Sequence, residues 1–490
     1  MSTVTPAGAG NWPAGRLTGQ AAVTVNGSEF LPEMQLRQWH EELDAMGLRS
    51  TGSPVHEQYI DELISRLERA GVTDVHGEPV PVSRWTAGRW SLDAGGKPIA
   101  TSSYIPYSGS TPPGGVTGAL ARVPPGAIPQ AGALAGKIAV FDVPLPATAY
   151  SVMAQISYAG WDPQGLIDPT ARYARPWAGI GDLISLLDSL PAAGAVGCVG
   201  VIDLPPEAAR GSYFPYDGHV RTVPGVYVDR TARPRLEALI ATGAPARLTL
   251  AATAERFVSR NVVGLIPGRT DELVILNSHT DGTNAVEDNG PNAIVAMAQY
   301  LSRLDRDLLP RSVMVSLTTG HFHGGIGQVT FAREHLDGAL RKAACALTIE
   351  HLGALEWAEI AGGQMALTGR PELGVIFVPE NEAMVGASLA ALKRAGDGPG
   401  QVLRPFVPAP GSPSGYGWPG EGTQLWTDGQ VMTMNYIAGP TYLLNWGIPT
   451  LDKCDIGRMR REAISLTEMV LETGSAPLAL LGSLDMPPLA

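Results

Sequence analysis

Residues 272–304 read ELVILNSHTDGTNAVEDNGPNAIVAMAQYLSRL, and this stretch decides how the chain folds. It opens with an apolar run at 273–277 that predicts a buried strand, and it closes with apolar residues spaced every three or four positions, as in an amphipathic helix. Between them lies a polar turn whose ionisable residues are His279, Asp281, Glu287 and Asp288. Ligands of α/β sheets bind beyond the carboxyl ends of strands, so a functional site is expected at this turn.

The alternation of strand and helix extends on both sides of this stretch. The sequence NVVGLIPG at 261–268 precedes it, further strands are expected at 311–318 and 344–350, and a final helix is expected at 456–472. This order predicts an α/β fold with a doubly wound, mostly parallel sheet and helices on both faces.

Size and composition restrict the class of protein. The chain has 490 residues and a net charge of −12, and only 17% of its residues are charged. It is long enough for two or three domains, and its acidity argues against a nucleic-acid partner. The three cysteines are far apart in apolar surroundings, which favours buried free thiols over a disulfide. No apolar run reaches the roughly 18 residues needed to span a bilayer, and no signal peptide is recognised, so a soluble cytoplasmic protein is expected.

The composition of the sequence and the pattern of expected elements change along the chain. Residues 1–28 are rich in Gly, Ala, Thr and Pro and predict a flexible lead-in. Two helices, at 34–47 and 57–71, and a strand pair at 75–82 and 85–92 follow. From 98 to 252, short apolar strands alternate with loops and no cluster of titratable residues occurs, so we interpret this part as a β-rich insertion. Residues 29–97 and 253–490 then form one discontinuous domain.

Several motifs resemble those of the co-catalytic zinc peptidases, which include bacterial leucyl aminopeptidases, glutamate carboxypeptidases and glutaminyl cyclases. They are NVVGLIPG, the strand ending in HTD, EDNG at a helix start, GLRSTGSPVH near the N-terminus and TLDKCDIGRM near the C-terminus. The resemblance covers most of the chain and implies a zinc-aminopeptidase-like fold. It also implies that residues 98–252 are an inserted domain of the protease-associated type.

The same resemblance assigns roles to individual residues. It makes His279 the first metal ligand, with Asp281 as the acid that orients its ring. It places Asp288 on the aspartate that bridges two metals and Glu350 on the acidic ligand of the first metal. Asp288 also precedes a helix, whose dipole favours the ionised carboxylate.

The sequence departs from the family pattern at the second metal. A glutamate pair is expected near 321–322, where the chain has His321-Phe322-His323, and a late histidine is expected where Asn445 stands. Both non-bridging ligands of the second metal and the general base are therefore replaced. The sequence predicts a single divalent metal, zinc, with iron and manganese as alternatives, because N and O ligands suit all three.

The two histidines around Phe322 are the candidate replacements. In an extended chain His321 and His323 would share a face. His323 is then a candidate fourth ligand, and His321 is a candidate general base because an imidazole with a pKa near about 6.5 can move protons at neutral pH. Both could instead be hydrogen-bonded loop histidines.

Three neighbouring residues receive weaker assignments. His351 is expected to face away from Glu350, since adjacent residues of a strand point to opposite sides. Glu287 is interpreted as a solvated loop acid. The long Gly- and Pro-rich stretch 397–422 is expected to form a surface loop near the active face. Its Glu421 is a candidate substrate-pocket residue, with simple turn chemistry as the alternative. Further along the chain, two more candidates for the substrate pocket are Tyr442 and Asn445, although the sequence favours a half-buried structural role for the tyrosine.

Three functional hypotheses follow. The first is a mononuclear metal hydrolase that uses His321 as proton carrier on a small amide or peptide-like substrate. The second keeps the metal but changes the reaction to that of a lyase, cyclase or isomerase. The third is a catalytically inactive relative that serves as a binding or scaffold protein. The expected partner is a small molecule or short peptide, and the oligomeric state stays open, with a homodimer as one option.

Overall fold

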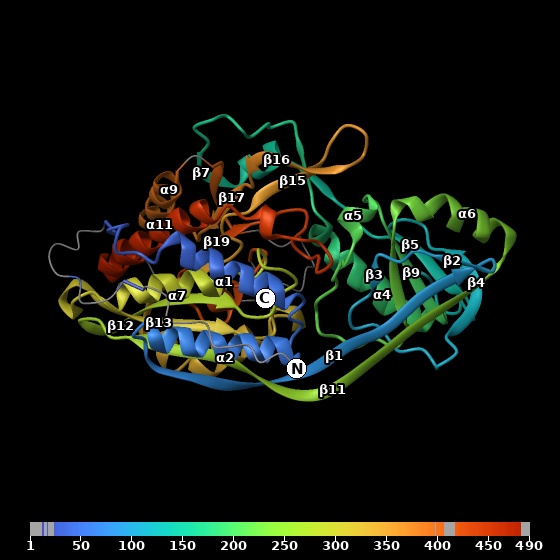
Figure 1. Cartoon of the computed structure of the whole chain (residues 1–490), viewed down its shortest axis with the longest axis horizontal. Coiled ribbons are helices and arrows are strands. Elements are labelled where there is room, and N and C mark those ends of the chain that lie inside the picture. Colours follow the sequence, from blue (N-terminus) through green and yellow to red (C-terminus); the bar gives the residue numbers. More distant parts are fainter. Residues whose placement is uncertain (1–11, 14–16, 18–23, 397, 406–416, 482–490) are drawn as a thin grey trace.

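The fold has two parts joined by a long two-stranded ribbon (Figure 1). It comes from a computed structural model, which describes residues 12–13, 17, 24–396, 398–405 and 417–481. The ribbon consists of β1 (Thr73–Ala94) and β11 (Pro245–Ile266), which are antiparallel and paired from one end to the other. The expected pair of strands at 75–82 and 85–92 is thus one continuous strand, because both halves pair with the same partner.

The larger part, here called the main body, contains a mixed sheet. Its strands are β12 (Thr270–His279), β13 (Arg311–Thr318), β14 (Ala343–Ile349), β17 (Gly374–Phe377), β18 (Gly400–Leu403) and β19 (Thr433–Ala438). They lie in the order β11-β13-β12-β14-β19-β17-β18. The central pairs β13–β12, β12–β14 and β14–β19 are parallel. This confirms the α/β fold with a mostly parallel sheet that the sequence predicts.

Helices cover both faces of this sheet because its strands are apolar on both sides. In β12, Val274 and Leu276 pack into one core, and Leu273 and Ile275 pack into another. The first face is covered by α1 (Glu33–Met46), α2 (Pro54–Arg69), α7 (Gly290–Leu301), α9 (Glu382–Ala395) and α11 (Ile456–Ser475). The second face is covered by α8 (Ile326–His335) and α10 (Thr423–Thr427). The short helix α12 (Leu478–Leu481) and the hairpin of β15 (Leu355–Glu359) and β16 (Met365–Pro371) complete the main body.

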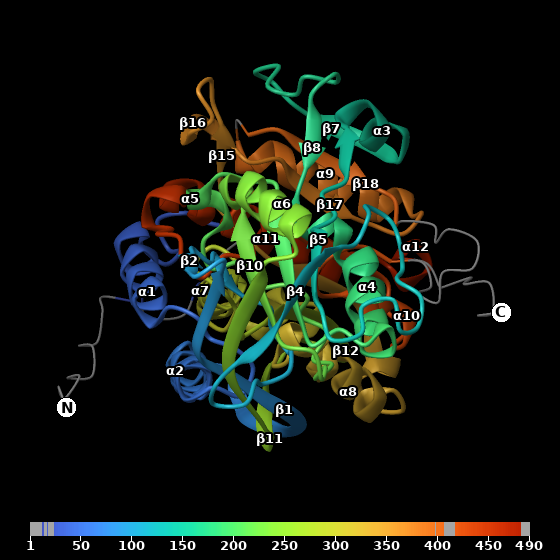
Figure 2. The same cartoon turned by 90° about the vertical axis from the view of Figure 1, so that its right-hand side faces the viewer.

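The smaller part has a core of its own. Its strands are β2 (Lys97–Ile99), β3 (Ser103–Tyr104), β4 (Val116–Arg122), β5 (Ile138–Asp142), β9 (Gly197–Ile202) and β10 (Gly225–Asp229). Its helices are α4 (Ile180–Ala193), α5 (Pro206–Ala209) and α6 (Arg233–Thr242). Strands β4, β5, β9 and β10 are parallel neighbours. Figure 2 views the molecule from the side on which this smaller part lies. The domain boundaries expected at 97/98 and 252/253 fall inside β2 and β11.

One segment of the smaller part reaches back to the main body. It runs from 147 to 178 and contains β6 (Ala147–Ala149), α3 (Tyr150–Gln155), β7 (Ser157–Trp161) and β8 (Arg172–Ala174). Strand β7 pairs with β18 and so extends the main sheet. We call residues 147–178 the covering segment.

Other expectations concern the ends of the chain and its surface. Most of the predicted lead-in 1–28 and residues 406–416 of the predicted loop 397–422 lie outside the described residues. Within the described part of that loop, Gly400–Leu403 form the buried strand β18, and Gly422 is the N-cap residue of α10. Among the described helices, none is both long and apolar enough to cross a membrane.

A buried histidine on α1 makes stability depend on pH. His40 is 2% exposed, and burial lowers its pKa from 6.5 to about 4. The unfolded chain therefore binds a proton in a range of pH where the folded protein does not, so stability is lost as pH falls from about 6.5 to about 4.

We expect His40→Leu to reduce this loss. Each pKa unit corresponds to about 1.4 kcal/mol, so the wild-type protein should lose up to about 3 kcal/mol more than the variant over this range. Urea unfolding at about pH 7 and about pH 4.5 measures the free energy of unfolding of the wild-type protein and of the variant. Equal losses in the two would contradict the assignment to His40.

Candidate metal centre

The carboxyl ends of four neighbouring strands meet at one edge of the main sheet. His279 is the last residue of β12, and His321 follows β13. Glu350 and His351 come directly after β14, and Gly439 comes directly after β19. This edge is where a parallel sheet places its ligands, and it brings together residues that are far apart in the sequence.

His279 lies at the centre of the group. Its Nδ1–H donates to the main-chain carbonyl of Asp281 at 2.8 Å, which leaves Nε2 facing the carboxylates. Nε2 lies 3.5 Å from Glu287 Oε1 and 3.7 Å from Glu350 Oε2. Burial opposes protonation of His279, but these carboxylates raise its pKa well above the usual value. The site therefore favours a positive charge at this nitrogen.

Glu350 presents one oxygen to His279. Its Oε1 accepts hydrogen bonds from the main-chain N–H of Glu421 at 2.8 Å and from Asn435 Nδ2 at 2.9 Å. Burial opposes ionisation of Glu350, but the imidazoles of His279 and His351 outweigh it and lower the pKa to about 2. The carboxylate is therefore ionised, and its orientation is fixed by Oε1. The turn at Gly420 can lie this close to Glu350 because it carries a glycine with a φ of +90°. A Cβ at this position would lie only 2.6 Å from Glu350 Oε1.

His351 faces the same side as Glu350, contrary to the expected alternation. Strand β14 ends at Ile349, and His351 has a φ of 59°, so the rule for extended chains does not apply to it. Its Nδ1–H donates to the carbonyl of Ala438 at 2.6 Å, and its Nε2 lies 3.8 Å from Glu350 Oε2. Burial lowers its pKa to about 4. A neutral imidazole is the form that binds a metal.

These three side chains fit a zinc ion. His279 Nε2, Glu350 Oε2 and His351 Nε2 are buried and have no hydrogen-bond partner in the described part of the chain. Buried polar atoms are rarely left without a partner, so three of them together require a common explanation. Ligand atoms about 2.1 Å from a tetrahedral zinc lie roughly 3.4 Å apart, close to the 3.7 and 3.8 Å found here.

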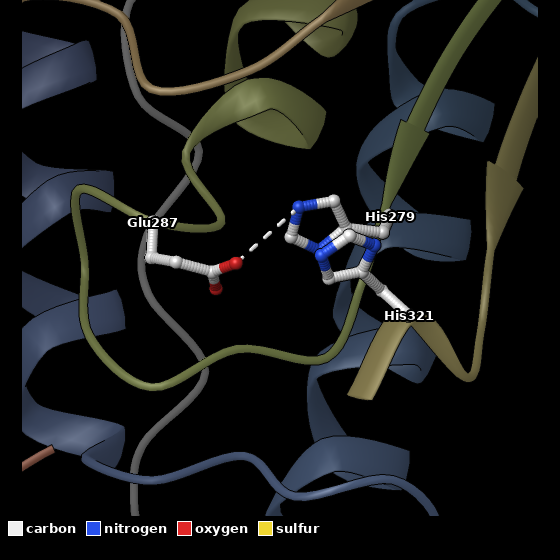
Figure 3. Close-up of side chains that lie close together, drawn as sticks. All are labelled: His279, Glu287 and His321. Atoms are coloured by element: carbon white, nitrogen blue, oxygen red, sulfur yellow. Dashed lines mark ion pairs between the residues drawn. The ribbon is translucent and has the colours of Figure 1, made fainter. Parts of the chain in front are cut away.

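Glu287 forms a second group of three with His279 and His321, shown in Figure 3. It is 1% exposed, although the sequence suggested a solvated loop acid. Asn284 Oδ1 accepts the main-chain N–H groups of Val286 and Glu287, and this tight turn directs Glu287 inward. Burial raises the pKa of Glu287 well above its usual value. A carboxyl group with a raised pKa can hold or accept a proton near neutral pH.

His321 and Glu421 form a pair beside the candidate metal ligands. His321 Nδ1–H donates to Glu421 Oε1 at 3.0 Å, and Thr318 Oγ1 lies 3.3 Å from Glu421 Oε2. The ring of His321 stacks on that of His279 with 4.1 Å between centroids. This arrangement fixes the imidazole and leaves Nε2 free to move a proton.

Asp288 is placed differently from the role that the family resemblance implied. Both of its oxygens accept from the guanidinium of Arg49, at 2.7 Å from Nε and 2.6 Å from Nη2, and both side chains are 0% exposed. Neither group of candidate metal ligands in the described part of the chain includes Asp288. The structure thus makes Glu287, one residue earlier, the acid of this turn that faces His279.

Asp281 acts through different atoms from those expected. Its carbonyl, not its carboxylate, accepts from His279. The carboxylate accepts from Thr51 Oγ1 at 2.6 Å and from the main-chain N–H groups of His321 and Phe322 at 3.0 and 2.9 Å. Asp281 therefore fixes the turn that carries His321.

His323 does not join the candidate metal ligands. Residues 321–323 form a 3-10 turn, so His321 and His323 point in different directions instead of sharing a face. His323 Nε2 accepts the main-chain N–H of Ser83 at 2.9 Å. It connects the turn to β1.

Tyr442 and Asn445 lie outside the cavity that adjoins the metal ligands. Tyr442 Oη lies 3.0 Å from the carbonyls of Leu355 and Lys453. Asn445 Nδ2 donates to the carbonyls of Ala208 and Arg210, at 3.1 and 2.9 Å. The hydroxyl of Tyr442 and the side-chain nitrogen of Asn445 are thus engaged by main-chain groups, and neither residue is among those that line this cavity.

Two cavities share His321 as a lining residue. The larger, of about 420 Å³, is bordered at one end by Glu287, Glu350, His321 and His351. Its remaining walls are mostly apolar, and we call it the apolar cavity. The smaller, of about 260 Å³, is bordered by His321, Glu421, Tyr216 and Asp217 among others. Glu421 thus borders the smaller cavity and is not among the residues that line the apolar cavity.

Sequence reasoning missed Glu287 and His351 as neighbours of His279. The only available signal was their position next to Asp288 and Glu350 in the motifs EDN and IEH. Within Glu287-Asp288 and Glu350-His351, the conformation of the turn determines which side chains face His279. The sequence did not reveal this conformation.

Comparison with known proteins places the fold in a structural group. No family model matches the chain, and no curated protein sequence matches it. Among solved structures, a zinc aminopeptidase from Bacillus subtilis has 14% identity and a TM-score of 0.63, covering 91% of this chain and 97% of its own. A peptidase M28 precursor from Shewanella amazonensis has 19% identity and a TM-score of 0.62, with coverages of 91% and 96%.

An aminopeptidase from Aneurinibacillus has 15% identity and a TM-score of 0.57, covering 94% of this chain and 97% of its own. All three structures extend over nearly the whole chain, insertion included. The fold of this protein is therefore that of the zinc aminopeptidases, as the motifs HTD and EDNG indicated.

Proposed function

We propose that the protein is a metal-dependent hydrolase that cleaves a small amide or peptide-like bond with a single divalent metal, zinc. His279, Glu350 and His351 would hold the metal. The observation that carries the proposal is the convergence of their three buried, unpartnered atoms beside the pair His321–Glu421. Zinc in such a site makes a water molecule more acidic and polarises a carbonyl group.

The protein's own residues supply proton transfer. His321 Nε2 would accept a proton from the attacking water and then donate it to the nitrogen that leaves when the carbon–nitrogen bond breaks. Glu421 stabilises the positive charge on His321 between these two transfers, because it accepts the Nδ1–H. Glu287, with its raised pKa, is the second group that could hold a proton.

The proposal is tested by turnover of amides that differ in their acyl group. Aminoacyl 4-nitroanilides and their N-acetylated forms report the released aniline by its colour, with the metal-loaded protein and with chelator-treated protein. In water labelled with oxygen-18, hydrolysis places one labelled oxygen in the acid product. A product without label would favour cyclisation or elimination, and no turnover of any amide would contradict the proposal.

We expect His321→Gln to lower kcat by about 10²- to 10⁴-fold, the range typical of a lost general base, while the bound metal stays. The matched control is His323→Gln, which keeps an acceptor for the N–H of Ser83 and should leave kcat unchanged. Steady-state rates and metal content of the two variants decide the assignment. Equal rates for both variants would remove His321 from the mechanism.

A further inference from the structure

The covering segment forms part of the wall of the apolar cavity. It contributes Thr148, Met153, Tyr173, Trp177 and Ala178, although it begins in the insertion and not in the main body. Pairing of β7 with β18 fixes one side of the segment to the sheet. The side that faces the cavity needs a separate anchor.

The lining of the cavity indicates what it can bind. The main body contributes Leu373, Val375, Phe377 and Ile437 to the lining, and no lysine or arginine borders the cavity in the described part of the chain. Its acidic and histidine neighbours are the two glutamates and two histidines of the candidate metal centre. Away from the metal ligands, a carboxylate-bearing group would find no cationic side chain, and an uncharged apolar group would find close contacts.

The two aromatic side chains contact the main body at Gly439. A Cβ at this position would lie 2.2 Å from Tyr173 Oη and 2.7 Å from a carbon of the Trp177 ring. The hydroxyl of Tyr173 donates to the carbonyl of Gly439 at 2.7 Å. The covering segment therefore fits against the end of β19 so closely that only glycine is accommodated.

Arg175 is the anchor on the cavity side. Its Nε–H donates to the same carbonyl of Gly439 at 2.6 Å, and its Nη2 lies 3.0 Å from Glu372 Oε1. The guanidinium lies 4.0 Å from the centroid of the Tyr173 ring. Arg175 is 7% exposed and Glu372 is 2% exposed. A buried ion pair costs desolvation and fixes geometry, which suits a role in positioning.

We propose that Tyr173 and Trp177 determine substrate specificity, and that Arg175 is the positioning residue that holds them against Gly439. The wall they form selects substrates that carry a bulky, uncharged apolar group next to the scissile bond. This inference rests on the proposed function, because it assigns the apolar cavity to the substrate of the metal centre.

The direct test is binding of a neutral aromatic probe without turnover. We expect 2-naphthylacetamide to bind at least tenfold more tightly than 2-naphthylacetate in isothermal titration calorimetry with chelator-treated protein, because a carboxylate could itself bind zinc in the metal-loaded protein. Trp177→Ala should weaken binding of the amide at least tenfold. Trp90→Ala, which removes a half-buried tryptophan that does not border the cavity, should change it less than twofold. Equal binding of amide and acid, or an unchanged affinity in Trp177→Ala, would overturn the proposal.

Arg175 is tested by exchange of the ion pair for apolar residues. The double variant Arg175→Met/Glu372→Leu avoids an unpaired buried charge, so its melting temperature should stay near that of the wild type. Its affinity for 2-naphthylacetamide should still fall at least tenfold. The single variant Arg175→Lys, which keeps a charged donor, should retain most of the wild-type affinity. An unchanged affinity in the double variant would leave Arg175 without a positioning role.

These results separate the inference from the proposed function. If the probe binds as expected but no amide is hydrolysed, the cavity assignment stands and the hydrolase proposal fails. If amides are hydrolysed but Trp177→Ala leaves both probe affinity and kcat/KM unchanged, the hydrolase stands and the specificity assignment fails.

Discussion

The variant His279→Ala is expected to lose its bound metal and to lower kcat/KM by roughly a thousandfold. His279 Nε2 faces both Glu287 and Glu350, so its removal takes away the shared nitrogen of both candidate triads. Metal ions contribute several kcal/mol to stabilisation of the transition state, and about 4 kcal/mol corresponds to this factor. Elemental mass spectrometry and turnover of a 4-nitroanilide measure the two effects.

Two controls make this result specific. His335→Gln replaces a histidine that lies 2.9 Å from Glu78, away from the sheet edge, and should retain full metal content. Chelation of the wild-type protein should abolish turnover, and added zinc should restore it. A His279→Ala protein that keeps one metal ion per chain would show that the metal binds elsewhere.

The variant Arg49→Met is expected to destabilise the protein by about 3–5 kcal/mol. Arg49 and Asp288 are both 0% exposed, so the variant leaves a buried carboxylate without its cation. Arg49 also donates to the carbonyl of Asn284 at 3.0 Å and so connects the chain before α2 with the turn that carries Glu287. Urea unfolding gives the change in free energy.

An exposed ion pair provides the matched control. Arg37 and Glu33 lie one turn apart on α1 with side chains 53% and 49% exposed, and Arg37→Met should change stability by less than about 0.5 kcal/mol. The double variant Arg49→Met/Asp288→Leu should be more stable than Arg49→Met alone, because it removes the unpaired charge. A loss in Arg49→Met no larger than in Arg37→Met would contradict the structural role of the pair.

The parts of the site that depend on regular structure could be predicted from sequence. The strand that ends at His279 and the strand that ends before Glu350 follow from apolar periodicity, and both residues lie at the candidate centre. The apolar faces of β12 likewise indicated helices on both sides of the sheet. Apolar periodicity indicates which residues are buried and where strands end, and these features were enough to predict the fold.

The parts that depend on turns could not be predicted in this way. His351 turns inward through a positive φ, and the 3-10 turn at 321–323 separates His321 from His323. Glu287, and not Asp288, faces His279 because a buried arginine from a distant part of the chain engages Asp288. A rule for extended chains cannot describe these residues, and a long-range ion pair leaves no periodic signal.

The ribbon of β1 and β11 has a consequence for how this chain could change during evolution. The two strands remain paired up to Ala94 and Ala246, and the N–H of Gly95 donates to the carbonyl of Pro245 at 3.2 Å. The points where the insertion begins and ends are therefore fixed side by side, whatever lies between them. The entropy of closing such a loop grows only with the logarithm of its length, so the insertion could lengthen or shorten at little thermodynamic cost. Residues 147–178 are the exception, since a change there would alter the wall of the cavity.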